Sequence, residues 1–110
     1  MSALLNQKCR SRTGQPPMSD TAIRDHLDQV SGWRVDTGSI EKTFTFTDFH
    51  ATISFVNGLA WICNAEDHHP ELLVTYSRCV VRFSTHSIGG ISSNDFVCAA
   101  QAVALVALVG

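Results

Sequence analysis

Apolar residues in this chain follow two alternating spacings, and the order of the spacings restricts the fold. Residues 19–32, 48–66 and those after residue 92 carry apolar side chains every three or four positions, which is typical of helices. Residues 33–47 and 71–86 are rich in β-branched and aromatic side chains, and each of these two regions contains a turn signal, which predicts two strands in each. The predicted order is therefore α-β-β-α-β-β-α.

This order predicts an α+β domain, in which a four-stranded antiparallel sheet has the helices packed on one face. The length of 110 residues fits one domain, and the 45% hydrophobic and 16% charged fractions are typical of a globular chain. Residues 1–18 contain a glycine and two consecutive prolines and are predicted to form an irregular N-terminal segment. Residues 19–110 are predicted to form the single domain.

Polar residues mark where the three helices begin. Ser19 or Asp20 can cap the first helix, and Asp48 can cap the second. Residues 92–95 have the pattern of a capping box for the third helix. Gly32 is predicted to end the first helix.

The apolar faces of the helices can also be predicted from spacing. The first helix is predicted to use Ile23, Leu27 and Val30, and the second to use Phe49, Ile53, Val56, Ala60 and Cys63. The run from Phe96 to Gly110 is interrupted only by Gln101, but it is shorter than the roughly 20 residues that a bilayer crossing needs. Because a helix that is apolar on nearly every side is usually buried, we expect another subunit to cover part of this one. The sequence thus predicts a small soluble oligomer that does not cross a membrane.

Charge and cysteine content exclude several functions. The formal net charge is −2 and the pI is near 6.2, so the chain offers no broad basic surface for nucleic acid. Cys9, Cys63, Cys79 and Cys98 form no C-x-x-C pair and are too widely spaced for a disulfide framework. No signal peptide is recognisable at the start. Reduced thiols in a cytoplasmic protein are the simplest prediction.

The stretch EDHHPELLVTY, residues 66–76, concentrates groups that titrate near neutral pH. Pro70 biases His69 toward an extended backbone, so the side chains of His68 and His69 are expected to point to opposite sides. A third histidine, His86, follows the last predicted strand, and the topology can bring it to the same end of the sheet. Three imidazoles near Asp67 and Asp95 would form a site that both donates and accepts protons at pH 7.

Each of these residues also has a structural interpretation without a catalytic role. A histidine in a loop is most often a solvated polar residue, and Asp95 fits the third helical position of the capping box. Asp67 and Glu66 can be surface charges at a helix end, and Tyr76 is expected to be a packed strand aromatic. His26 and His50 are expected to be exposed on helix faces, without a role. A metal site built from the three loop histidines lacks cysteine or carboxylate ligands at the usual short spacing, so no metal is predicted.

Taken together, these motifs resemble the pterin-4a-carbinolamine dehydratase (4a-hydroxytetrahydrobiopterin dehydratase) family. The matching segments are EDHHPELLVTYSR, FSTHSIGG and GISSNDF, supported by Trp33 and by FTFTDF, and they cover about residues 20–105. The order and spacing of the whole series make the resemblance specific. One position departs from the family: Asn64 stands where a charged or titratable residue is usual, four positions before the first histidine. An amide can form hydrogen bonds but cannot hold a charge.

The resemblance implies a reaction. Family members are hydro-lyases that remove water from 4a-hydroxytetrahydropterin (the 4a-carbinolamine) and give quinonoid dihydropterin. This step recycles the tetrahydropterin cofactor of aromatic amino-acid hydroxylases and needs no cofactor or metal. The family forms homodimers or homotetramers. Some members also act as dimerisation partners of a transcription factor, which implies a binding or coactivator module as the alternative function for this chain.

The resemblance also implies roles for particular residues. His68 and His86 would act as the acid–base pair, and either could give or take the proton. His69 would chiefly hold the pterin ring, and Asp95 would orient or tune a histidine, so that these four residues form the catalytic set. The substrate-binding residues would be Asp67, His68, His69, Ser84, Thr85, His86 and Ser87.

Overall fold

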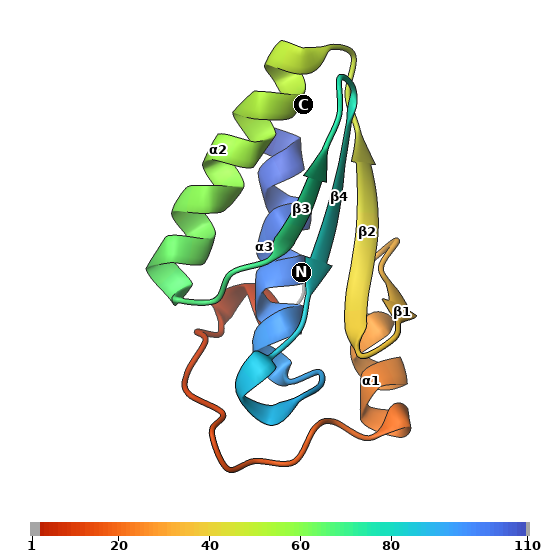
Figure 1. Cartoon of the computed structure of the whole chain (residues 1–110), viewed down its shortest axis with the longest axis vertical. Coiled ribbons are helices and arrows are strands. Elements are labelled where there is room, and N and C mark those ends of the chain that lie inside the picture. The colour runs from red at the N-terminus through yellow and green to blue at the C-terminus, as the bar shows by residue number, and fades with distance from the viewer. Residues whose placement is uncertain (1–2, 110) are drawn as a thin grey trace.

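The computed structural model describes residues 3–109 and confirms the predicted order of helices and strands (Figure 1). The α-helices are α1 (Asp20–Leu27), α2 (Phe49–Glu66) and α3 (Ser93–Val109); the strands are β1 (Arg34–Asp36), β2 (Ser39–Thr45), β3 (Glu71–Val74) and β4 (Arg78–Phe83); and the short 3-10 helices are η1 (Ala3–Asn6) and η2 (His86–Ile88). The fold is α+β, as the alternating spacings predict.

Two hairpins form the sheet, whose strand order is β1-β2-β4-β3 with every neighbouring pair antiparallel. Thr37 and Gly38, with φ of 45° and 75°, make the tight turn between β1 and β2. Positive φ at both central residues matches the right-handed twist of the strands that they join. The long β2–β4 pairing in the centre joins the hairpins and sets Phe44 opposite Cys79.

One face of the sheet is covered by α2 and α3, which pack against each other (Figure 1). The buried side chains of β4 alternate along the strand, as expected when one face of a sheet meets the core, whereas Ser39, Ile40 and Glu41 at the start of β2 are all buried. Phe44 of β2 packs on Phe55 of α2, with ring centroids 4.7 Å apart. The fully buried aromatic side chains are Phe55, Phe83 and Phe96.

The first helix starts as predicted but ends early. The Ser19 side chain accepts a hydrogen bond from the Ala22 N–H, which confirms Ser19 as the cap. The helix stops at Leu27, and a turn then carries the chain to Gly32, which has a left-handed backbone. His26 is half-buried, with its ring 5.0 Å from that of Phe96, so the prediction that it is exposed is wrong.

The second helix is capped by Asp48, as predicted, but its buried face matches the predicted one only in part, at Cys63. The Asp48 carboxylate accepts from the Ala51 N–H at 2.8 Å. The buried residues are Thr52, Phe55, Leu59 and Cys63, whereas Phe49 and Ala60, both predicted to lie on the apolar face, are exposed. Because α2 is apolar on several sides, more than one stripe has helical spacing, and only the position of the sheet selects one.

The exposure of Tyr76 and of His50 can also be compared with the sequence predictions. Tyr76 is 67% exposed and lies in the turn between β3 and β4, so the prediction of a packed strand aromatic is wrong. The turn begins before Ser77, which places Tyr76 outside either strand. His50 is exposed, as predicted.

The third helix is mostly buried within its own subunit. Its first turns lie between the sheet, α2 and η1, and Phe96 to Ala99 are fully buried. Toward its end the helix emerges, and Leu108 is 84% exposed. Another subunit is therefore not needed to cover its first half. Of the helices in residues 3–109, none has the length and hydropathy that a bilayer crossing requires.

Residues 7–18 form a segment that we call the N-terminal strap, which passes the start of α3 on its way to α1 (Figure 1). It is mostly irregular in backbone, but it is anchored to the domain. The Cys9 N–H donates to Glu66 at 2.8 Å, and the Met18 N–H donates to the carbonyl of Ile91 at 2.8 Å. Ahead of the strap, Leu4 in η1 is only 1% exposed.

Candidate active site

The second helix ends in a backbone motif that turns the chain into the histidine pair. Asp67 has a left-handed backbone with φ of 51°, and its N–H donates to the carbonyl of Asn64. The N–H of His68 donates to the carbonyl of Cys63 at 3.1 Å. These two bonds form a Schellman motif, which satisfies carbonyl groups at the helix end and fixes the direction of the outgoing chain. His68 and His69 therefore start from a defined position.

His68 is held by a buried carboxylate. Its Nε2 lies 2.6 Å from Oδ1 of Asp95, and the exposed fractions of the two side chains are 11% and 0%. The imidazole also stacks on Phe83, with ring planes 15° apart. An ionised carboxylate in this place accepts the proton of Nε2 and leaves Nδ1 as the nitrogen that can accept another. The contact thus orients the ring and selects its tautomer.

Asp95 completes the predicted capping box at the same time. Its Oδ2 accepts from the Ser92 N–H and from the Thr85 hydroxyl, both at 2.9 Å. The Ser92 Oγ lies 2.7 Å from the Thr85 Oγ1 and accepts from the Asn94 N–H at 3.2 Å. A buried carboxylate is stable only when its oxygens have such partners. The structural and functional interpretations of Asp95 are therefore compatible.

His86 reaches the same region from the opposite connection. The Thr85 N–H donates to the carbonyl of Gly90 at 2.8 Å, which closes a short loop after β4. Inside this loop, η2 runs from His86 to Ile88 and is followed by Gly89, whose φ is 67°. The His86 side chain is exposed.

His69 lies on the solvent side of the helix end. Its Nε2 is 2.9 Å from Oδ1 of Asn64, and both side chains are exposed. The two adjacent histidines thus have different surroundings, as expected from the extended backbone before Pro70. The departure at Asn64 therefore affects the second histidine, rather than the first.

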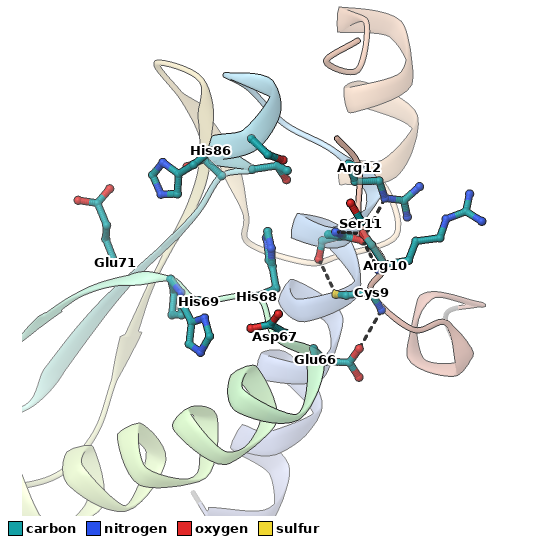
Figure 2. Close-up of a pocket in the computed structure, with 15 residues that line it drawn as sticks. Cys9, Arg10, Ser11, Arg12, Glu66, Asp67, His68, His69, Glu71 and His86 are labelled. Atoms are coloured by element: carbon teal, nitrogen blue, oxygen red, sulfur yellow. Dashed lines mark hydrogen bonds between the residues drawn. The ribbon is translucent and has the colours of Figure 1, made fainter. Parts of the chain in front are cut away.

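An open pocket of about 700 Å³ brings these segments together (Figure 2). Figure 2 shows His86, His68 and His69 arranged around it, with the N-terminal strap on the other side of His68. The lining residues are Cys9, Arg10, Ser11, Arg12, Glu66, Asp67, His68, His69, Pro70, Glu71, Ser84, Thr85, His86, Ser87 and Asn94.

All predicted substrate-binding residues line this pocket, and Asp95 lies behind it in contact with His68. Sequence reasoning missed the strap residues Cys9–Arg12, together with Glu71 and Asn94. Asn94 ties the strap in place, since its Oδ1 accepts from Arg12 Nε at 3.1 Å and its Nδ2 donates to the Arg10 carbonyl. Nothing in the spacing of residues 1–18 indicated that this segment meets the histidines.

Glu66 anchors the strap through its charge. Burial acts to raise the pKa of this carboxyl, but hydrogen bonds from the Cys9 N–H and Gln101, with the charge of Lys8, bring the pKa below its usual value. Glu66 is therefore ionised at neutral pH and holds the strap by charge-assisted hydrogen bonds.

The donor set of the pocket is suited to proton transfer. Imidazoles titrate close to neutral pH, and here one is paired with a carboxylate while two are accessible. Within residues 3–109, no group of three or more His, Cys, Asp or Glu side chains is placed to hold a metal ion.

Comparison with known proteins identifies the family. The family described as pterin 4 alpha carbinolamine dehydratase matches residues 16–105. A protein of Chromobacterium violaceum named "Putative pterin-4-alpha-carbinolamine dehydratase" is 45% identical over 93% of this chain and 94% of its own length. A protein of Stenotrophomonas maltophilia with the same name is 47% identical over 93% and 90%.

A solved structure agrees with these sequence matches. The crystal structure of a "transcriptional coactivator/pterin dehydratase" from Brucella melitensis has a TM-score of 0.79 and 29% identity, and the match covers 82% of this chain and 98% of that one. Fold, motif order and sequence matches agree, and this chain belongs to the pterin-4a-carbinolamine dehydratase family.

Proposed function

We propose that this protein dehydrates 4a-hydroxytetrahydropterin to quinonoid dihydropterin. In this reaction the bond between C4a and the hydroxyl oxygen breaks, the oxygen leaves as water after receiving a proton, and N5 loses its proton as the C4a–N5 double bond forms. The observation that carries the proposal is that His68, His69 and His86 line one pocket, with buried Asp95 on His68. The pocket can therefore present both a proton donor and a proton acceptor to one flat ligand.

The roles follow from the different surroundings of the three imidazoles. His68 is oriented by Asp95 and leaves Nδ1 for proton exchange, so we assign it to one proton transfer. Exposed His86, on the other connection, is assigned to the second transfer. His69 contacts the pterin ring, and Asp67 and Ser84–Ser87 complete the binding surface. Which of His68 and His86 gives the proton depends on the face of C4a that carries the hydroxyl.

The proposed context is pterin recycling in the cytoplasm. The substrate is the spent cofactor released by an aromatic amino-acid hydroxylase, and the reaction changes no oxidation state, so it needs no further cofactor. Four free cysteines, three of them buried, support a reducing compartment.

The test is the decay of the 4a-hydroxypterin absorbance with purified protein. We expect the wild type to exceed the spontaneous rate, and His68→Ala and His86→Ala each to lower kcat on the order of 10²-fold or more. His50→Ala is the matched control, because His50 is an exposed histidine on α2 outside the pocket. A wild-type rate equal to the spontaneous rate would refute the proposal, as would equal losses in the control and the pocket variants.

A second candidate function is a binding module of the coactivator type, which the name of the Brucella protein raises. The observation in its favour is that α2 exposes two large apolar side chains, Trp61 at 79% and Phe49 at 49%. These side chains replace the α3 surface expected from the sequence, since the first half of α3 is buried. They can also hold a homodimer or homotetramer together. A stoichiometric partner that is lost in Trp61→Ala and kept in His68→Ala would favour this function.

A further inference from the structure

Three of the four thiols form a cluster beneath the strap side of the pocket. Cys9 comes from the N-terminal strap, Cys63 from α2 and Cys98 from α3. The Sγ atoms of Cys9 and Cys98 lie 3.6 Å apart, and interaction between the Cys63 and Cys98 thiols shifts the pKa of both groups. Cys79, on β4, makes no thiol contact within the described part of the chain.

Access differs sharply within the cluster. Cys9 is half-buried and lines the pocket (Figure 2), whereas Cys63 and Cys98 are 1% and 0% exposed. A small oxidant in the pocket therefore meets Cys9 first. Interaction with Cys63 and Cys9, together with burial, raises the pKa of Cys98, so Cys98 is not the first group oxidised and gives up its proton only when its sulfur attacks Cys9.

We propose that Cys9 and Cys98 are a peroxide-sensitive pair that closes to a disulfide and locks the N-terminal strap onto α3. Hydrogen peroxide transfers one oxygen to the Cys9 sulfur, giving a sulfenic acid and water. The Cys98 sulfur then attacks the Cys9 sulfur; the sulfur–oxygen bond breaks, and the hydroxyl leaves as a second water with the proton of Cys98. Two thiols are oxidised by two electrons, which the peroxide accepts.

The geometry allows this closure. A disulfide is about 2.05 Å long, so the two sulfurs need to approach by roughly 1.5 Å. Cys98 is fixed in a helix, but Cys9 lies in an irregular segment that can supply the movement. The Cys9 thiol already points toward α3, because it donates to the Asn94 carbonyl at 3.6 Å.

The disulfide would fix one side of the pocket. Cys9 is followed by Arg10, Ser11 and Arg12, which line the pocket, and Cys98 lies one turn beyond Asn94, to which the strap is hydrogen-bonded. The link also closes a loop of nearly the whole chain, which restricts the unfolded state strongly. We expect oxidation to raise Tm by on the order of 10 °C, and a reductant to reverse the rise.

The experiment treats the full-length protein with hydrogen peroxide, alkylates the remaining thiols and maps the peptides by mass spectrometry. We expect the four thiols to fall to two, with the peptides of Cys9 and Cys98 linked within one chain. Cys9→Ser and Cys98→Ala should each abolish the link and the rise in Tm. Cys63→Ala and Cys79→Ala are the matched controls and should retain both.

Three outcomes would overturn the inference: a Cys63–Cys98 link in the wild type, a link between chains only, or oxidation of Cys9 without a disulfide. Circular dichroism of Cys98→Ala shows whether that buried variant folds. Cys9→Ser changes a half-buried position on the strap, so the test does not depend on Cys98→Ala alone.

Discussion

The pocket has two sides that are held in different ways. The histidine side consists of residues 67–70 and 84–87, and it is fixed by a Schellman motif, a loop closed by hydrogen bonds and the buried Asp95 network. The strap side consists of Cys9–Arg12, which belong to an irregular segment. This segment is held in place by the side chains of Glu66 on α2 and Asn94 on α3. Proton transfer needs groups held in place, whereas a surface that adapts to a ligand or responds to oxidation does not.

The largest expected effect comes from removing the charge on the histidine side. Asp95→Asn keeps the size of the side chain and can still accept from Ser92, but an amide does not stabilise a protonated His68. We expect kcat to fall about 10²-fold, measured by the absorbance assay.

Ser92→Ala separates this role of Asp95 from helix capping. It removes the capping hydroxyl and leaves the contact between Asp95 and His68. The variant should lose about 1 kcal/mol of stability with a much smaller loss of kcat. Similar kcat values in the two variants would show that Asp95 acts only as a cap.

A smaller effect is expected from the backbone that presents the histidines. Asp67 has φ of 51°, in the left-handed region of backbone conformation. Alanine adopts this conformation at a higher free-energy cost than aspartate does. Asp67→Ala should lower the free energy of unfolding by about 1 kcal/mol, measured by urea denaturation. Asp67→Gly is the matched control and should not, since glycine adopts this conformation freely. Equal losses in the two variants would mean that the side chain matters, rather than the backbone.

The strap side should respond to pH through Glu66. Its pKa is lowered in the folded protein, so its stabilising contribution is complete above the unfolded-state pKa of 4.5 and is lost as the pH falls through the lowered pKa. Glu66→Gln should cost on the order of 1 kcal/mol at pH 7, measured by urea unfolding, and should flatten the pH dependence of stability between pH 7 and the acid range. Glu71→Gln, on the exposed rim, is the control. An unchanged pH profile in Glu66→Gln would show that its charge does not hold the strap.

The smallest expected effect concerns the second histidine of the pair, His69, which contacts Asn64. The Oδ1 of Asn64 accepts a hydrogen bond from Nε2 of His69, but the amide carries no charge. In Asn64→Asp a carboxylate would stabilise the protonated imidazole, so any step that needs neutral His69 should shift to higher pH by less than about one unit. The pH–rate profile measures this shift, with Asn57→Asp on the same helix as control. A large loss of kcat would instead assign His69 a proton-transfer role.

Much of the fold could be predicted from local sequence. Ser19, Asp48 and the box of Ser92 and Asp95 begin their helices as predicted, because each cap depends on residues within four positions. The errors have tertiary causes. The buried face of α2 was misassigned because several apolar stripes fit its spacing, and the sheet decides which stripe is covered.

For the candidate site, too, some features depend on local sequence and others on tertiary packing. The sequence determined that a histidine pair, a third histidine and an acid follow particular strands and helices, since motif order is a property of the chain. Only the tertiary structure decided that Asp95 lies on His68 rather than His69, that Asn64 contacts the second histidine, and that the strap meets the pocket and brings Cys9 to Cys98. These contacts join residues up to 89 positions apart, and their geometry is set by how α3 packs between the sheet and α2. Local spacing carries no information about such packing.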